Sequence, residues 1–337
     1  MIDADIDRKS AVKLLRYSLK HEPRNLARLG VLIAPDLIAD LRAGYALYLV
    51  QRAGNPKGRD LAAIYMPPYI TEFLHMGEQA WIALADAYTY LLDLLQAAPD
   101  AEGLNGEKIF LPLAACRVYA PVRPSKLIAV GRNYTGYTQF KGKAPGKIPT
   151  GFIKTLSSIA GPGRDIVKPR ITQELDCETE LAVVIGKRCK DVPEEKAWDV
   201  IAGYTIVNDI TARDLGALEK QGGHMFLAKT FDTFAPLGPW MITRDAIPDP
   251  MHLRIQTRVN GETRQDGNTK DMLFNIPQLV SHFSQITLMP GDIIATGSPG
   301  GGALANPDWY LNAGDIIESE IEGIGILTNG VVDEPLV

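Results

Sequence analysis

Residues 176–186 read Asp-Cys-Glu-Thr-Glu-Leu-Ala-Val-Val-Ile-Gly, an acidic stretch followed by an unbroken apolar run. The apolar part is rich in β-branched residues and is typical of a buried β-strand. Alternate side chains of a strand point to the same face, so Glu178 and Glu180 are expected side by side at its start. Two such carboxylates are either solvated at a polar strand edge or held together by a cation. This segment alone leaves both interpretations open.

A second candidate strand, within residues 203–207, ends in Asn208-Asp209 and leads into a predicted helix near residues 211–220. Asp209 is either a turn or cap residue or a third carboxylate beside the two glutamates. Three carboxylates with open coordination positions suit a hard ion such as Mg²⁺, which keeps waters and accepts substrate oxygens. Arg213 is either a surface residue or a fork for a substrate carboxylate.

Two further segments carry polar groups in unusual surroundings. Lys229 lies in an apolar stretch, although lysine is seldom fully buried without a partner. A site with three carboxylates would supply that partner. Residues 290–302 predict a strand that leads into a glycine turn bearing the hydroxyls of Thr296 and Ser298. That turn is either a flexible connection or part of a substrate site.

The composition is that of an ordinary globular protein, with 337 residues, 46% hydrophobic and 22% charged. A net charge of -5 without a Lys/Arg cluster argues against nucleic-acid binding. No apolar stretch reaches about 18 residues, so no membrane span is expected. The three cysteines form no CxxC pair, and the N-terminus lacks the apolar segment of a signal peptide. We therefore expect a reduced, cytoplasmic protein.

The pattern of the sequence changes near residue 120, from a part with a long predicted helix to one of short β segments and turns. A linker marked by prolines lies at this point. We predict an N-terminal α+β domain over residues 1–120 and a mostly β domain over residues 121–337. Residues 26–33 and 44–50 predict two strands, or a strand and a helix. Apolar residues at three- and four-residue spacing predict one long helix over residues 70–97.

Turn signals are frequent in the second part of the chain. Asn260-Gly261 predicts a β-hairpin, and Asn329-Gly330 predicts another. A helix is expected near residues 275–286. The two copies of Gly-Asp-Ile-Ile, residues 291–294 and 314–317, predict turns that enter strands.

Taken together, these segments resemble the fumarylacetoacetate hydrolase family in order and spacing. The resemblance covers roughly residues 121–330, and residues before it resemble the smaller leading domain of longer members. The matching segments are ETELAVVIGKRCKDVPEEKAWDVIAGYTIVNDITARD, AKTFDTFAPLGPW, VNGETRQDGNT and LMPGDIIATGSPGG. The resemblance implies a mostly β fold with α (α+β), with rolled, barrel-like sheets in the catalytic domain, and a homodimer.

The same resemblance implies a metal and substrate contacts. It implies Mg²⁺, or Mn²⁺ or Ca²⁺, on Glu178, Glu180 and Asp209. It also implies that Arg213, Lys229 and the hydroxyl of the Thr-Gly-Ser turn contact substrate. The remaining candidate contacts are Thr296, Ser298, Asn133 and Tyr134. His224, five residues before Lys229, is either a surface or packing residue or a catalytic one.

One segment departs from the family pattern. Many members carry a histidine after Asn-Tyr and a glutamate three residues later, a pair that activates water. Here Tyr137 and Phe140 stand at those positions. Tyr137 either packs over the substrate or replaces the missing base, although an unperturbed phenol is a poor base at neutral pH.

The expected function is that of a metal-dependent enzyme acting on a small 2-oxo or diketo acid. Our first expectation is C–C hydrolysis of an acylpyruvate-like acid, such as a fumarylacetoacetate-like or fumarylpyruvate-like compound, in aromatic or sugar-acid breakdown. The alternative is isomerisation or decarboxylation of a 2-oxo diacid through a metal-stabilised enolate. A catalytically degraded protein that only binds a 2-oxo acid is the third possibility.

Overall fold

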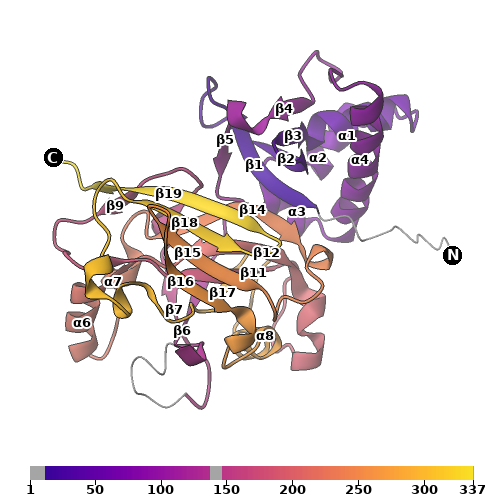
Figure 1. Ribbon diagram of the computed structural model, residues 1–337. Helices are drawn as coiled ribbons and strands as arrows, with labels where there is room; N and C mark the ends of the chain where they lie inside the picture. The colour runs from indigo at the N-terminus through magenta and orange to yellow at the C-terminus, as the bar shows by residue number, and fades with distance from the viewer. Residues whose placement is uncertain (1–11, 137–145, 337) are drawn as a thin grey trace.

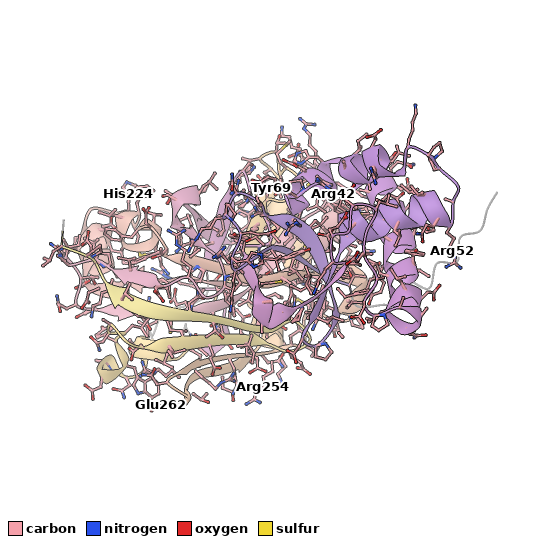
Figure 2. The ribbon with its side chains drawn as sticks, turned by 90° about the horizontal axis from the view of Figure 1, so that it is seen from above. Arg42, Arg52, Tyr69, His224, Arg254 and Glu262 are labelled. Atoms are coloured by element: carbon pink, nitrogen blue, oxygen red, sulfur yellow. The ribbon has the colours of Figure 1, made fainter. Side chains whose placement is uncertain are left out.

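The computed structural model describes residues 12–136 and 146–336. Figure 1 shows a helical N-terminal part at one end and a larger body rich in strands at the other. Viewed from above, Arg42 and Arg52 of the N-terminal part lie on the side of the molecule away from His224 (Figure 2).

The N-terminal part confirms a mixture of strands and helices. Of the two alternatives for residues 26–50, the structure has a strand followed by a helix. Its strands are β1 (Lys13–Leu19), β2 (Arg28–Ala34), β3 (Leu37–Asp40), β4 (Phe110–Pro112) and β5 (Cys116–Tyr119). Its helices are α1 (Leu41–Gln51), α2 (Gly58–Tyr65), α3 (Ile70–His75) and α4 (Glu78–Ala97).

The single long helix predicted over residues 70–97 is wrong in one respect, because it is two helices. The break falls at Gly77, whose φ of 66° lies in the left-handed region and cannot continue a right-handed helix. Both helices still bury apolar side chains, among them Phe73 of α3 and Leu91 of α4.

A sheet of twelve strands runs through both parts of the molecule, in the order β4-β3-β2-β1-β14-β12-β11-β17-β6-β7, with β5 paired to β1 and β8 to β14. Its strands beyond residue 120 are β6 (Leu127–Gly131), β7 (Thr150–Lys154), β8 (Ile159–Ala160), β11 (Thr179–Ile185), β12 (Ile201–Asn208), β14 (Ala235–Thr243) and β17 (Ile293–Ala295). The antiparallel pairing of β1 with β14 joins Lys13 to Ile242 and Leu14 to Met241. The predicted boundary at residue 120 is therefore crossed by one continuous sheet, and the domain division stays a prediction.

A five-stranded sheet has the order β16-β15-β18-β19-β9, and a two-stranded sheet pairs β10 with β13. These strands are β9 (Ile166–Lys168), β10 (Leu175–Asp176), β13 (Thr211–Ala212), β15 (Arg254–Val259), β16 (Glu262–Asn268), β18 (Ile316–Ile321) and β19 (Gly325–Asp333). The later helices are α6 (Arg213–Gln221), α7 (Leu227–Thr230) and α8 (Ile276–Phe283). Short 3-10 helices are η1 (Leu113–Ala115), η2 (Leu156–Ser158), η3 (Glu194–Val200), η4 (Arg244–Ala246), η5 (Thr269–Asp271), η6 (Gly302–Leu304) and η7 (Pro307–Trp309).

The mixed α and β fold is confirmed, with open sheets. In the part of the chain that the structure describes, β4 and β7 are the edges of the large sheet, and β16 and β9 those of the five-stranded sheet. The sheets therefore do not close into barrels. Alternate residues of β11 enter two different cores: Leu181 and Val183 pack with the five-stranded sheet, and Ala182 and Val184 join the core of the N-terminal helices.

The two predicted Asn-Gly hairpins have different outcomes. Asn260-Gly261 forms the turn between β15 and β16, with φ values of 52° and 81°. The Asn329-Gly330 prediction is wrong, because both residues lie inside β19. The Asn329 side chain donates to the backbone carbonyls of Gly161 and Arg164, so it anchors a neighbouring loop instead of making a turn.

The hydropathy of the helices bears on membrane insertion. No helix within residues 12–136 and 146–336 combines the length and apolar character needed to cross a membrane.

Candidate metal centre and active-site cavity

Three carboxylates converge where β11 begins and β12 ends. Glu178 precedes β11, Glu180 is its second residue, and Asp209 directly follows β12. The two strands are antiparallel and pair Thr179 with Asn208, so the start of one meets the end of the other. Single carboxylate oxygens of Glu178, Glu180 and Asp209 lie within 4.8 Å of one another, and all three residues are buried. The geometry expected from strand alternation is therefore present.

Backbone hydrogen bonds hold this triad of Glu178, Glu180 and Asp209 in place. The Asp209 amide donates to the Glu178 carbonyl at 2.8 Å, and the Glu178 amide donates to Asn208 Oδ1 at 2.9 Å. The Gly297 amide donates to Glu180 Oε2 at 2.9 Å. The ligand oxygens are thus fixed by the strands and by the glycine turn after β17.

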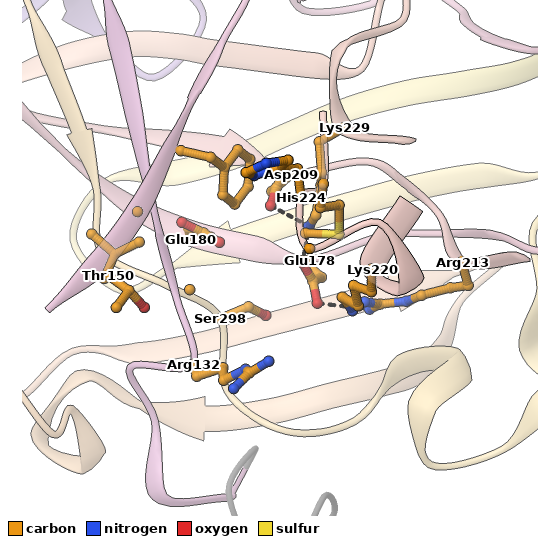
Figure 3. Close-up of a pocket in the computed structure, with 16 residues that line it drawn as sticks. Arg132, Thr150, Glu178, Glu180, Asp209, Arg213, Lys220, His224, Lys229 and Ser298 are labelled. Carbon is orange, nitrogen blue, oxygen red and sulfur yellow. Dashed lines mark hydrogen bonds and ion pairs between the residues drawn. The ribbon is translucent and has the colours of Figure 1, made fainter. Parts of the chain in front are cut away.

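Three cationic side chains surround the triad. Lys229 Nζ donates to Glu178 Oε2 at 2.5 Å and also to Asp209, and Lys154 Nζ donates to the other oxygen of Asp209. Arg213 Nη2 donates to Glu178 Oε1 at 2.6 Å and Asp176 Oδ2 at 2.7 Å. Figure 3 shows Lys229 and Arg213 approaching the triad from different elements. The acidic partner expected for Lys229 is therefore present.

Charges around the triad affect its members differently. Burial opposes ionisation of Glu178, but the positive charges of Arg213 and Lys229 prevail and hold its pKa well below its ordinary value. Burial and the neighbouring Asp209 and Glu178 raise the pKa of Glu180 well above its ordinary value.

Glu180 is the member of the triad that most lacks positive charge. Its described hydrogen bond comes from a neutral backbone amide, and it makes no ion pair within the described residues. A buried carboxylate in this position is stabilised by a bound cation. Three carboxylate oxygens are also the donors that hard divalent ions prefer, so the residues present fit such an ion.

A cavity of ≈ 300 Å³ opens onto the triad (Figure 3). This volume lies at the lower end of the range for small-molecule sites. Seven of the predicted site residues line this cavity: Glu178, Glu180, Asp209, Arg213, Lys229, His224 and Ser298. The other lining residues are Val130, Gly131, Arg132, Thr150, Gly151, Phe152, Lys220, Gly223 and Met225. The triad thus shares one small space with Arg213, Lys229 and Ser298.

The predicted contacts in the loops before and after this cavity have mixed placements. Ser298 lines it and accepts a hydrogen bond from Gln265 Nε2 at 2.9 Å. Asn133, Tyr134 and Thr296 are buried and are not part of the lining. Asn133 donates to the carbonyls of Phe274 and Thr296, so it connects two loops. Substrate contact by these three residues stays a prediction.

The candidate proton carriers also differ in placement. His224 is exposed and lines the cavity, after the end of α6. Tyr137 and Phe140 lie outside the described residues, so the predicted role of Tyr137 stays a prediction.

Four polar residues of the site were not anticipated. Lys154 is fully buried against Asp209, and Asp176 holds Arg213. Each of these two had a sequence signal. Lys154 lies at the end of a short apolar segment, and Lys229 also has apolar neighbours. Asp176 lies two residues before Glu178. Arg132 and Lys220 had none that distinguishes them from ordinary surface residues.

Comparisons with known proteins point to one family. Residues 126–332 match the family model described as Fumarylacetoacetate (FAA) hydrolase C-terminal. A mitochondrial oxaloacetate tautomerase of Xenopus laevis is 40% identical over 270 residues, which is 79% of this chain and 79% of that protein. The chain belongs to the fumarylacetoacetate hydrolase family, and it is an enzyme of that family.

Solved structures of the family agree over nearly the whole chain. A fumarylacetoacetate hydrolase of Exiguobacterium antarcticum covers 96% of this chain and 100% of its own, with 31% identity and a TM-score of 0.70. A maleylpyruvate hydrolase of Sphingobium sp. SYK-6, in complex with manganese(II) ion and pyruvate, covers the same shares with 30% identity and a TM-score of 0.68. A 5-carboxymethyl-2-hydroxymuconate delta-isomerase of Mycobacterium smegmatis covers the same shares with 31% identity and a TM-score of 0.67. The relatives therefore include both hydrolases and isomerases.

Proposed function

We propose that this protein is a divalent-metal-dependent enzyme that enolises a small 2-oxo acid, and that keto–enol tautomerisation is its reaction. The observation that carries the proposal is the buried triad, in which Glu180 has no cationic partner among the described residues, at the base of a small cavity. Mg²⁺ is our first choice of ion and Mn²⁺ the second, because both are bound by carboxylate oxygens.

The triad would hold the ion, and the bound ion would polarise the 2-oxo group and so acidify the adjacent C–H bond. Lys229 contributes a positive charge at the cavity wall, where it can donate to an oxygen that becomes negative. Arg213 can orient the carboxylate of the substrate through its planar fork of donors. Its guanidinium is already held in place by Asp176.

Tautomerisation also moves a proton between carbon and oxygen. His224 lines the cavity and is exposed, so its imidazole can take up a proton from the substrate and exchange it with water. We assign it this role because, of the described residues that line the cavity, it is the one histidine.

The sequence favours tautomerisation over hydrolysis. Hydrolysis needs a base that activates water, and Tyr137 and Phe140 replace the His–Glu pair that the family resemblance associates with that step. Tautomerisation needs no activated water. The 40% identity to an oxaloacetate tautomerase over 79% of both chains supports the same choice, and oxaloacetate is the substrate we would test first.

A direct experiment compares the two reactions in the same enzyme preparation. The Mg²⁺-loaded protein is mixed with the enol form of oxaloacetate, and ketonisation is followed by absorbance; an acylpyruvate is supplied in parallel, and its products are identified by mass. We expect accelerated ketonisation that chelation abolishes, with slow or no cleavage. Rapid cleavage without accelerated ketonisation would contradict the proposal.

C–C hydrolysis of a fumarylpyruvate-like diketo acid, in aromatic-compound breakdown, is the second candidate. The similarity to the maleylpyruvate hydrolase favours it. The variant Tyr137→His with Phe140→Glu restores the family pair and tests it. If only that base is missing, the double variant gains acylpyruvate cleavage; no gain with the metal still bound would show that the cavity serves a different reaction.

A further inference from the structure

Four cationic side chains line the active-site cavity, and they fall into two pairs. Arg213 and Lys229 form ion pairs with the triad. The Arg132 and Lys220 side chains make no hydrogen bond or ion pair with any residue that the structure describes. No carboxylate other than the triad contributes to the described lining. Two positive charges therefore face the cavity without a counter-charge from the described part of the chain.

Backbone structure places Arg132 at the cavity. It directly follows β6 and has a φ of 59°, a left-handed conformation that is unfavourable for a residue other than glycine. The next residue, Asn133, fixes this turn by hydrogen bonds with Phe274 and with the carbonyl of Thr296. Figure 3 shows the Arg132 side chain below Ser298, with Lys220 above it and to its right in this view.

Lys220 reaches the same space from helix α6. It lies seven residues after Arg213, which is two helical turns, so both side chains are on one face of the helix. Burial lowers the pKa of Lys220, and the positive charges of Arg213, Lys229 and Arg132 lower it further. This part of the cavity therefore has an excess of positive charge.

A tally of formal charges indicates what the cavity would accept. The centre contains four carboxylates (Asp176, Glu178, Glu180, Asp209) and three cations (Lys154, Arg213, Lys229). A divalent ion at the triad leaves one positive charge, which a single substrate carboxylate cancels. Arg132 and Lys220 then leave two positive charges unbalanced, and a second anionic group on the same ligand would reduce this excess to one.

We propose that Arg132 and Lys220 form a second anion subsite, which selects 2-oxo acids that carry a further carboxylate away from the 2-oxo acid group. The inference rests on the proposed function, because it assigns the first carboxylate to the triad side of the cavity. It names two specificity-determining residues. Selectivity arises because a ligand without the second charge leaves both cations without an anionic partner in the cavity.

The test uses two substrates, oxaloacetate and its 4-ethyl ester, of which only the first carries the second negative charge. For Arg132→Gln and Lys220→Gln we expect the KM for oxaloacetate to rise about tenfold or more, as loss of a charged hydrogen bond would. KM for the ester should change less than about twofold. Arg132→Lys should recover part of the loss, because it restores the charge. Arg188→Gln, an exposed arginine outside the cavity lining, is the matched control and should change neither value.

Calorimetric binding of the same two compounds to the metal-loaded protein separates this inference from the proposed function. A tenfold preference for oxaloacetate that both Gln variants abolish supports the subsite, with or without turnover. Equal losses for oxaloacetate and the ester, or no loss for either, would overturn it. Absence of turnover on both compounds in the wild type would overturn the proposed function instead, while the binding difference still decides on the subsite.

Discussion

Lys154 and Lys229 both donate to Asp209, but only one of them is placed to meet a substrate. Lys229 lines the cavity, whereas Lys154 has no exposed side-chain surface and is absent from the described lining. Two lysines beside the same carboxylate therefore separate the effect of charge near the metal centre from the effect of contact with substrate.

For Lys229→Met we expect turnover to fall by about 10² or more with the fold retained, because the apolar stem is replaced by similar bulk and a donor to the developing negative charge is lost. Turnover and circular dichroism check this result. Lys154→Met is the comparison and should lose less turnover, because its ammonium does not reach the cavity. Equal losses would show that charge beside Asp209 matters and contact with substrate does not.

At this scale the sequence predicted the residues whose spacing reflects a regular element. Glu178 and Glu180 were expected together because strand side chains alternate, and Asp209 because it ends the adjacent strand. Arg132 and Lys220 could not be predicted in the same way. They come from a turn after β6 and from the end of α6, and only the tertiary structure brings them to one cavity.

Asp40 connects three elements of the N-terminal part. Its Oδ1 accepts from the Ala43 amide at 2.9 Å and so caps α1, and its Oδ2 accepts from the Tyr17 hydroxyl of β1 at 2.6 Å. Asp40 itself is the last residue of β3. Its carboxylate therefore fixes the start of the helix against the sheet.

We expect Asp40→Ala to lower the free energy of unfolding by about 2 kcal/mol or more, from the lost cap and the unsatisfied buried hydroxyl. Tyr17→Phe is the control, because it removes one hydrogen bond and keeps the cap. It should cost about 1 kcal/mol. Denaturant unfolding measures both, and an Asp40→Ala loss no greater than that of Tyr17→Phe would contradict the role of the cap.

Local sequence signals predicted most elements but not their interruptions. The Asn-Gly hairpin succeeded at residues 260–261, where both residues adopt left-handed conformations. It failed at residues 329–330, because the Asn329 side chain satisfies two carbonyls of another loop. Such long-range hydrogen bonds have no local sequence pattern, and the same holds for the helix break at Gly77.

On the scale of the whole molecule, the continuous sheet joins the N-terminal part to the part that contains the triad. β1 lies between β2 and β14, and one apolar core contains Leu14 and Phe73 from the first part with Leu237 and Met241 from the second. Side chains from both parts therefore share this core. The sequence predicted a boundary near residue 120. Strand pairing across that boundary could not be predicted, because it joins residues more than 200 positions apart.

This architecture predicts one cooperative unfolding transition for the whole chain. Separating the parts would expose the edge of β14 and the shared core, so partial unfolding costs much of the stability of both. Differential scanning calorimetry with separate fluorescence probes in each part checks it. Two resolved transitions would contradict it and would favour the independent domains, residues 1–120 and 121–337, that the sequence suggested.

Glu178, Glu180 and Asp209 are proposed to bind one divalent ion together. Calorimetric titration of the chelated protein with Mn²⁺ tests it most directly, with Glu180→Gln as the variant and the exposed Glu195→Gln as the control. We predict one ion per chain in the wild type and in Glu195→Gln, and affinity weakened more than about 100-fold in Glu180→Gln, which loses a charged ligand. Unchanged stoichiometry and affinity in Glu180→Gln would show that the triad does not bind the ion.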